Sequence, residues 1–203
     1  MTAPFRDVVT DLAGLEALFR APGRLVANKK TDRIVGPTAA FIAACPFVLL
    51  ATGGSDGQVT VSPKGGSPGF VKVLDERRLV IPDANGNNLI DGLRNLVENP
   101  HIGLLFVVPG REETLRVDGR AWPTVDPEVL DVVTEDGGRR PKVAIGVEVT
   151  TTFIHCSRSF SRGQVWQPDS WDGLVAPEAM EMFRCHLADN LPADELPEGG
   201  GSG

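Results

Sequence analysis

One stretch near the middle of the chain, residues 79–109, constrains the fold most, because it holds a strand, a turn, a helix and a second strand without interruption. Residues 79–81 form a short apolar run of strand-forming type, and residues 82–88 are rich in turn formers. Apolar spacing then changes to that of a helix about three turns long over residues 88–98, which Asn99-Pro100 ends. Residues 102–108 predict a buried strand.

The turn before this helix carries candidate ligand-binding groups. Asn87 and Asn88 stand at the predicted helix entry, where backbone N–H groups without partners can bind a phosphate or another anion. The same residues are typical of an ordinary turn and helix cap. From this segment alone, the ordinary turn is the favoured interpretation.

A second stretch of small residues, Pro63–Gly69, predicts a loop that contains one cation, Lys64. Its backbone can approach a ligand closely because few side chains intervene. The alternative is a flexible surface loop with an incidental lysine, which this segment alone favours. The sequence contains neither a P-loop nor a dinucleotide-binding fingerprint.

The rest of the chain predicts short strands separated by turns, with few long helices. This pattern indicates a mostly β, α+β fold in which antiparallel strands form a closed or partly closed barrel with flanking helices. We expect an N-terminal helical extension over residues 1–34, a barrel domain over 35–190 and a disordered tail over 191–203. The expected strands are 47–52, 58–62, 70–74, 79–81, 102–108, 114–122 and 143–154, and the expected helices are 7–20, 37–44, 88–98, 126–134 and 176–190.

Charge and cysteine content exclude several classes of protein. A net charge of −7 argues against a general binder of nucleic acid or of anionic membranes. The three cysteines form no Cys-x-x-Cys pair and predict reduced thiols in a cytoplasmic protein. Neither a signal peptide nor an apolar run of membrane-spanning length is present. His155 and Cys156 are adjacent in a predicted strand and therefore face opposite ways, so we predict no metal site and assign no catalytic residue.

The segment after the last strand, residues 157–166, joins two arginines to a tryptophan. Such clusters suit a planar anionic ligand or a contact between subunits. Core packing of Trp166 is the alternative.

Four motifs in this order make the chain resemble the pyridoxamine 5'-phosphate oxidase-like FMN-binding split-barrel family, and within it a bacterial branch of FMN-dependent enzymes. The motifs are CPFVLLATGGSDGQVTVSPKGG, LVIPDANGNNLIDGLRNLVENPHIGLLFVVPG, ETLRVDGRA and FIHCSRSFSRGQVW. They cover most of residues 35–172. The resemblance implies a split β-barrel that binds FMN over residues 35–190.

The resemblance also implies which residues surround the cofactor. Those implied to edge the flavin or hold its phosphate are Ser62, Pro63, Lys64, Ile81, Pro82, Asp83, Asn87, Asn88 and Arg94. Members of the family are typically homodimers, which implies that Arg162 and Trp166 reach the cofactor of the other subunit. The chain departs from the oxidase itself at Ile90-Asp91-Gly92, where the oxidase has a Ser-Arg-Lys cluster, and its substrate-handling arginine and histidine have no counterpart.

These residues lead to one principal hypothesis and two alternatives. The first is a homodimeric FMN-dependent oxidoreductase with a small-molecule substrate, in which NAD(P)H or a small organic donor reduces the flavin. A flavin-binding or flavin-storage protein without turnover is the second. The third is a relative that uses deazaflavin F420 or binds haem.

Overall fold

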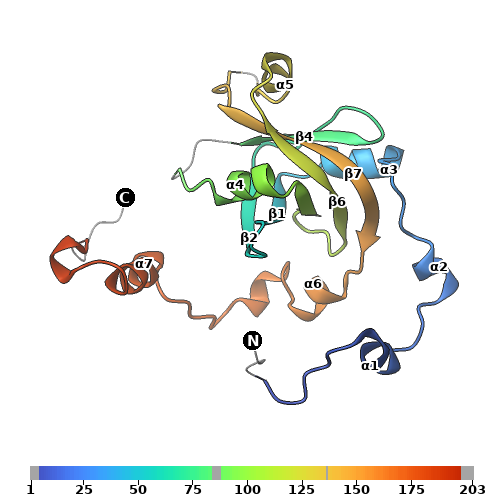
Figure 1. Cartoon of the computed structure of the whole chain (residues 1–203), viewed down its shortest axis with the longest axis horizontal. Helices are drawn as coiled ribbons and strands as arrows, with labels where there is room; N and C mark the ends of the chain where they lie inside the picture. The colour runs from blue at the N-terminus through green and yellow to red at the C-terminus, as the bar shows by residue number, and fades with distance from the viewer. Residues whose placement is uncertain (1–4, 84–87, 136, 198–203) are drawn as a thin grey trace. The chain divides into compact units, whose positions relative to one another are not determined.

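The computed structural model describes residues 5–83, 88–135 and 137–197, which separate into two compact units (Figure 1). The first unit ends at Trp166 and contains every strand of the described residues. The second begins at Gln167 and consists of helical segments and their connections. Each unit is described by itself below.

All strands of the described residues belong to one antiparallel sheet, ordered β2-β1-β5-β6-β7-β4-β3. Most neighbours in the sheet are also neighbours in sequence. The pairings of β1 with β5 and of β4 with β7 are the long-range ones. The strands are β1 (Phe47–Gly53), β2 (Val59–Gly65), β3 (Lys72–Val73), β4 (Arg78–Asp83), β5 (His101–Val107), β6 (Thr114–Thr124) and β7 (Val143–His155).

An ion pair joins two strands that lie far apart in the order of this sheet. Lys64 lies in β2, the first strand of the order, and Asp83 in β4, the sixth, yet the lysine ammonium contacts the aspartate carboxylate. In a flat sheet, five spacings of about 4.8 Å would place these strands about 24 Å apart, beyond the reach of a lysine. The sheet is therefore curled into a barrel (Figure 1). Because β2 and β4 share no backbone pairing, the barrel is split between them, and the predicted mostly β split barrel is confirmed.

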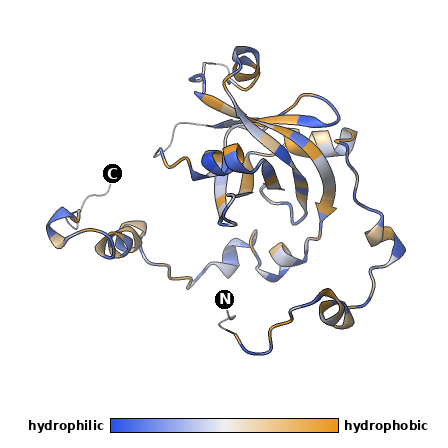
Figure 2. Ribbon diagram, viewed as in Figure 1, coloured by the Kyte–Doolittle hydropathy of each residue, from blue (hydrophilic) through white to orange (hydrophobic). Residues whose placement is uncertain are grey.

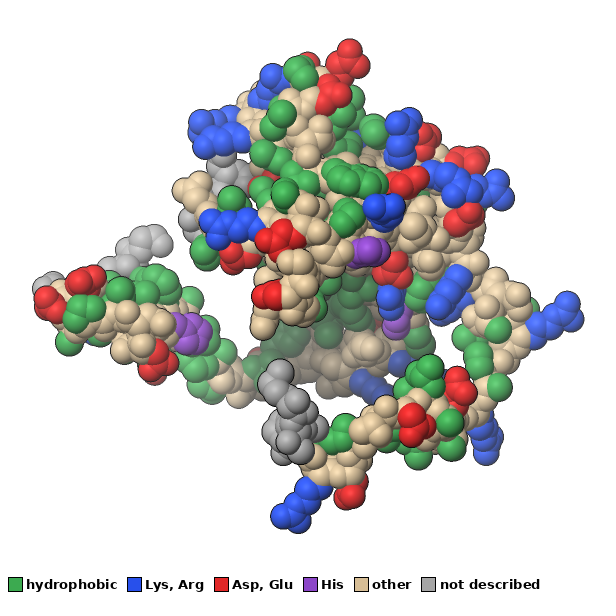
Figure 3. Space-filling model, viewed as in Figure 1, with side chains coloured by type: hydrophobic (Ala, Val, Ile, Leu, Met, Phe, Trp, Pro, Cys, Tyr) green, Lys and Arg blue, Asp and Glu red, His purple; other side chains and the backbone are tan. Residues whose placement is uncertain are grey.

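The strands are rich in apolar residues (Figure 2), and those that are buried fill the interior of the barrel, whereas charged side chains of both signs lie on the surface (Figure 3). Phe106 of β5 and Val117 of β6 are fully buried, whereas Arg116 and Arg120 of β6 are exposed. Each buried side chain of this size contributes about 1.5–3 kcal/mol to folding. The prediction that residues 114–122 form a strand with one wet face is confirmed.

Helices α3, α4 and α5 pack on strands of the barrel. Helix α4 packs on β1, β2 and β6 and buries Leu96, while α3 buries Ile42. At the start of α5, the Asp126 carboxylate accepts a hydrogen bond from the Glu128 N–H group, which caps the helix. The helices are α1 (Leu12–Ala17), α2 (Arg24–Ala27), α3 (Gly36–Ala43), α4 (Asp91–Glu98), α5 (Pro127–Val132) and α6 (Arg158–Arg162).

Strands β2 and β4 each continue through a proline at which the sequence predicts that they end. The predicted loop at Pro63 and Lys64 is wrong, because β2 continues through both residues. Proline is tolerated there since β2 is an edge strand that pairs only with β1. Strand β4 likewise continues through Pro82, at a point where β3 no longer runs beside it. In contrast, the strand expected at 70–74 is reduced to β3.

Helix α4 begins later than predicted. Asn88 has φ +61°, a left-handed conformation that cannot continue into a helix, and Ile90 is the residue that precedes the first turn. The helix therefore has eight residues and starts at Asp91. The three-turn helix expected from Asn88 is wrong in its first turn, because the apolar spacing of Leu89 and Ile90 does not reveal the backbone conformation of Asn88.

The second unit contains one regular helix, α7 (Ala179–Ala188), between the short 3₁₀ turns η1 (Pro168–Ser170) and η2 (Ala193–Glu195). The helix expected over residues 176–190 is confirmed with shorter ends. Met182 and Phe183 of α7 are 45% and 52% exposed. In both units, no helix of the described residues has the length and apolar character needed to span a membrane.

Candidate functional site

A cavity of about 620 Å³ opens where the barrel is split. Pockets that hold small organic ligands measure about 300–1,000 Å³. Its walls come from β1, β2, the end of β4, the start of α4 and the start of β7. The lining residues are Leu50, Thr52, Thr60, Val61, Ser62, Pro63, Lys64, Asp83, Asn88, Leu89, Ile90, Asp91, Gly92, Leu93, Leu96, Lys142, Val143 and Ile145.

Strand β2 presents a polar row to this cavity. Thr60, Ser62 and Lys64 are half-buried, whereas the alternate residues Val59 and Val61 are 69% and 64% exposed. In an ordinary half-buried strand the inward row is apolar. The reversal leaves hydroxyl and ammonium groups facing the interior, where each needs a partner.

One end of the cavity carries two lysines. The Lys64 ammonium contacts the Asp83 carboxylate, and the side chains are 25% and 18% exposed. The β4–β7 ladder pairs Asp83 with Val143, which brings the preceding Lys142 to the same end of the cavity. Lys64, Asp83 and Lys142 thus line the same cavity, although β2 and β4 lie far apart in the order of the sheet.

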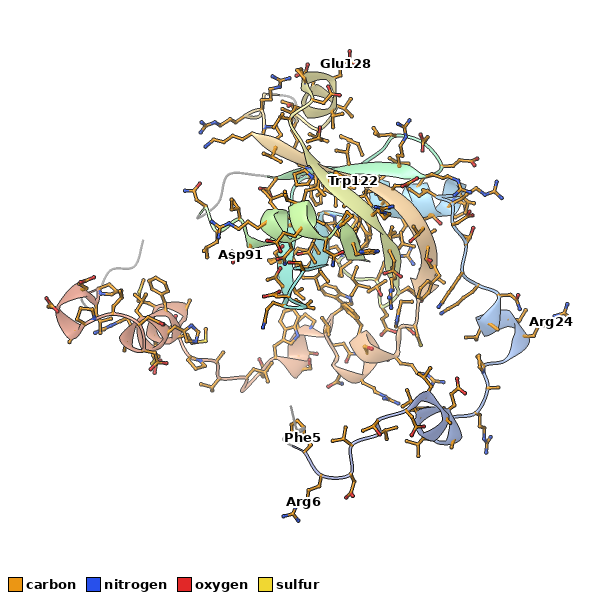
Figure 4. The ribbon with its side chains drawn as sticks, viewed as in Figure 1. Phe5, Arg6, Arg24, Asp91, Trp122 and Glu128 are labelled. Carbon is orange, nitrogen blue, oxygen red and sulfur yellow. The ribbon has the colours of Figure 1, made fainter. Side chains whose placement is uncertain are left out.

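The first turn of α4 supplies backbone donors to the cavity wall. Ile90, Gly92 and Leu93 all line the cavity, and Ile90 provides no side-chain cap. The first N–H groups of a helix have no intrahelical acceptor, and the positive end of the helix dipole favours an anion there. Asp91, which Figure 4 labels at the start of α4, lies 3.8 Å from the Arg94 guanidinium.

A cluster of three polar side chains lies farther along the same wall. Asn95 of α4 donates from Nδ2 to Thr52 Oγ1 over 3.2 Å and to Thr60 Oγ1 over 3.1 Å. The two threonine oxygens are 3.1 Å apart and share a hydrogen bond. Thr52 and Thr60 are opposite each other in the β1–β2 ladder, so backbone register fixes their separation.

The rest of the cavity wall is apolar. Leu50, Leu93 and Leu96 contribute to it from β1 and α4, and Val143 and Ile145 from β7. A flat organic ring can bury its surface against such a wall. The arrangement therefore suits a ligand with an anionic end, an extended apolar face and a few hydrogen-bonding atoms.

The structure brings together five of the residues expected from sequence: Ser62, Pro63, Lys64, Asp83 and Asn88 all line the cavity. The others are placed differently. Ile81 is fully buried in the barrel core, Pro82 is half-buried outside the lining, and Arg94 is 70% exposed outside it. Asn87 lies outside the described residues.

Arg162 and Trp166 stand apart from the cavity lining as well. Trp166 donates from Nε1 to the Arg111 carbonyl over 2.8 Å, and its ring stacks on Phe160 with centroids 5.7 Å apart. Arg162 is exposed at the end of α6. A contact of either residue with a second subunit stays a prediction.

Sequence reasoning missed Lys142, Thr52 and Asn95. No local motif marks Lys142, because only the pairing of Asp83 with Val143 brings it to the cavity. A signal for Thr52 and Thr60 was present in the hairpin, since each is a polar residue on an otherwise alternating strand. To predict from this signal that the two threonines lie opposite each other, the strand register of the hairpin would have been needed.

Residues 37–156 match the sequence model of the family described as pyridoxamine 5'-phosphate oxidase, which is more than half of the chain. The chain belongs to the pyridoxamine 5'-phosphate oxidase family. No protein of curated function matches it at a significant level. The family match spans β1 to β7 and so includes all the strands of the described residues.

Several solved structures are similar to this chain. HupZ of Group A Streptococcus has a TM-score of 0.50 and 19% identity, over 60% of this chain and 93% of that one. A general stress protein 26 relative from Clostridium acetobutylicum has a TM-score of 0.43 and 13% identity, over 59% and 85% of the two chains. HutZ, a haem storage protein from Vibrio cholerae, has a TM-score of 0.41 and 15% identity, over 57% and 89%.

Proposed function

We propose that this protein is an FMN-dependent oxidoreductase whose cofactor occupies the cavity at the split of the barrel. The observation that carries the proposal is that Lys64, Lys142 and the uncapped first turn of α4 all line one cavity with an extended apolar wall. Family membership supports it, because the family is typically one of flavin binders.

The residues present fit the phosphate of FMN. A phosphate dianion requires cations and N–H donors, and here two lysines and the first turn of α4 supply both. Asp83 opposes this anion, but its charge is partnered by Lys64. The apolar wall around Leu50, Leu93 and Ile145 suits the ring system.

When bound, FMN supplies the hydride-accepting ring, so the chain needs no nucleophile of its own. In this proposal Lys64 and Lys142 bind the phosphate and fix the orientation of the cofactor. Leu93 and Leu96 of α4 exclude water from the inner wall of the cavity. The electron donor is NAD(P)H or a small organic molecule that enters from the open side of the split.

A homodimer is part of the proposal. Strand β2 is an edge strand, and its apolar residues Val59 and Val61 are 69% and 64% exposed. Exposed apolar residues on an unpaired edge favour coverage by another chain. Sedimentation of the purified protein tests this part, and a monomer at micromolar concentration would contradict it.

The cavity residues favour a flavin over haem. Haem iron in proteins is held by histidine, cysteine, methionine or tyrosine side chains. In the part of the chain that the structure describes, none of these residue types lines the cavity. Deazaflavin F420 shares the ring shape and an anionic phosphate, and a storage role shares the whole site, so spectroscopy and turnover must separate these functions.

The test begins with the absorbance spectrum of the purified protein and the mass of any released chromophore. FMN bands and an FMN mass support the proposal, and multiple turnovers with NADH or NADPH exclude storage. The double substitution of Lys64 and Lys142 by alanine should weaken FMN binding by about 100-fold, since two charge-assisted contacts are lost. Lys30→Ala, outside the cavity lining, is the matched control. Equal FMN affinity in the double variant and the control would refute the site.

A further inference from the structure

Three cationic side chains surround one aromatic ring near the end of β7. The Lys29 and Lys30 ammonium nitrogens lie 4.9 and 5.6 Å from the centroid of the Phe153 ring. The Arg116 guanidinium carbon lies 5.7 Å from the same centroid. Distances below about 6 Å are typical of cation–π contacts. No two of the three charged groups are therefore farther apart than twice the longest of these distances.

The β6–β7 ladder places the guanidinium beside the ring. Arg116 of β6 is directly opposite Phe153 of β7. Leu115 and Val117, on either side of Arg116, are buried in the barrel, whereas Arg116 is exposed. Because successive side chains of a strand point to opposite faces, Arg116 and Phe153 lie on the outer face of the sheet.

The N-terminal segment brings the two lysines to the same ring. Thr31 and Thr152 form an antiparallel bridge with backbone hydrogen bonds of 3.0 and 2.6 Å. Lys29 Nζ also donates to the Ile154 carbonyl over 3.2 Å. Residues far apart in sequence thus meet at Phe153, and tertiary contacts fix the cluster.

The cluster has an excess of positive charge. Asp118 is the partner of Arg116, with its carboxylate oxygens 2.9 and 3.0 Å from Nε. Among the described residues, neither Lys29 nor Lys30 forms an ion pair with a carboxylate. Three cations and one carboxylate leave two positive charges unbalanced, in a chain whose net charge is −7. Like charges held this close repel one another, and an anion bound between them relieves the repulsion.

The cluster and the cavity lie at opposite ends of β7. Ile145 lines the cavity, and Phe153 lies about 26 Å farther along the strand at about 3.3 Å per residue. The three cations of the cluster are not among the residues that line the cavity. The cluster is therefore separate from the proposed cofactor site and does not depend on it.

We propose that Lys29, Lys30 and Arg116 form a binding site for a small polyanion of the di- or triphosphate class. Linked phosphate groups spread their charge over several oxygens and so match cations that surround a ring. Asp118 contacts Nε of Arg116, and the two Nη groups of this arginine point donors at the phosphates. Nucleic acid is the less favoured occupant, because it binds to extended basic surfaces and the chain as a whole is acidic.

The test is calorimetric titration with inorganic triphosphate in magnesium-free buffer of low ionic strength. The unsubstituted protein and the variant Lys64→Ala/Lys142→Ala, which lacks the cations of the cavity, are both titrated. Both should show binding at the cluster that added salt weakens, because the cluster is exposed. Lys29→Gln, Lys30→Gln and Arg116→Gln should each weaken it about threefold, and the triple variant about 30-fold.

Two further variants distinguish a built site from general attraction between charges. Phe153→Leu keeps every charge but removes the ring that the cations surround, and it should weaken triphosphate binding about threefold. Arg6→Gln/Arg20→Gln/Arg24→Gln removes the same amount of charge from exposed arginines of the N-terminal segment, two of which Figure 4 labels. This control should keep nearly full affinity.

The outcomes decide between the site and its alternatives. Weaker binding in the glutamine triple variant and in Phe153→Leu, with retention in the arginine control, supports the site. Absence of triphosphate binding overturns it, as does equal affinity in the control and in either of those two variants. Tighter binding of a short DNA duplex than of triphosphate overturns the ligand class. Because Lys30→Ala should keep FMN affinity and weaken triphosphate binding, failure of one site is recognised separately from failure of the other.

Discussion

The ammonium group of Lys64 is paired with the carboxylate of Asp83, across the split between β2 and β4. The cation that would bind an anionic ligand is therefore already partnered in the free protein. A phosphate entering this end must share Lys64 with Asp83 and tolerate a second negative charge nearby. The oppositely charged pair both holds the lysine in place and limits its affinity for anions.

Replacing Asp83 by asparagine should strengthen the binding of FMN. The substitution removes the like charge beside the phosphate and keeps a side chain of the same shape, so we expect about a fivefold gain that shrinks as salt is added. Titration at low and high ionic strength measures it. Asp131→Asn, which breaks the surface pair with Arg140, is the control and should leave affinity unchanged. A fall in affinity would show instead that Asp83 is needed to position Lys64.

Substitution of Gly92 by alanine should stabilise the protein and weaken the binding of its ligand. Gly92 lies in the first turn of α4, and a β-carbon there would lie 3.6 Å from Thr52 Oγ1, an ordinary contact distance. Helix propensity alone raises the free energy of unfolding by about 0.5–1 kcal/mol. The added methyl group also projects toward the cavity and should lower FMN affinity. Urea denaturation measures the free energy of unfolding, and titration measures the FMN affinity. A gain in both quantities would show that the ligand does not bind beside Gly92.

Gly119 and Gly103 provide a matched pair for the β-bulge between β6 and β7. A β-carbon at Gly119 would lie 2.2 Å from the Glu148 carbonyl oxygen, whereas one at Gly103 would have its nearest atom at 3.6 Å. The ladder register shifts between Asp118 and Gly119, so backbone crowds this position. We expect Gly119→Ala to lower the free energy of unfolding by more than about 2 kcal/mol and Gly103→Ala by much less. Similar losses in the two variants would contradict this explanation.

The contact between Glu98 and Ser55 should make stability depend on acidic pH. Hydrogen bonds from the Ser55 hydroxyl and the Ser55 N–H group, at 2.8 and 3.2 Å, hold the pKa of Glu98 below its usual value. A lowered folded-state pKa contributes stability above the unfolded value of about 4.3, and that stability is lost as the pH falls through the folded value. Ser55→Ala should therefore destabilise the protein at pH 7 and match the unsubstituted protein near pH 2. A pH-independent difference between the two would rule out the linkage.

Local pattern predicted the strands and helices well where side-chain period and backbone agree. The buried run at residues 102–108 and the alternating strand at 114–122 correspond to β5 and β6. Prediction failed where one residue's backbone decided the outcome, as at Asn88, whose left-handed φ delays α4. It also failed at Pro63 and Pro82, since a proline ends a central strand but not one with an open side.

The site was predicted only in part because it depends on contacts between distant segments. Lys64 and Asp83 could be named from motifs that the sequence shows directly. Lys142 reaches the cavity through the β4–β7 register, and Asn95 reaches the threonines through the rotation of α4. The local spacing of residues predicts neither of these positions, since both depend on how the barrel closes.

Strand β2 carries the polar row of the cavity while being held by β1 alone on its backbone edge. Strand β2 can therefore separate from the barrel once a single ladder, its pairing with β1, is broken. A ligand that contacts Lys64 on β2 and Lys142 before β7 connects the two sides of the split. Binding should then slow amide hydrogen exchange along Val59–Gly65, because the free energy needed to open β2 rises by the free energy of ligand binding, and the cofactor joins two strands that no backbone pairing connects.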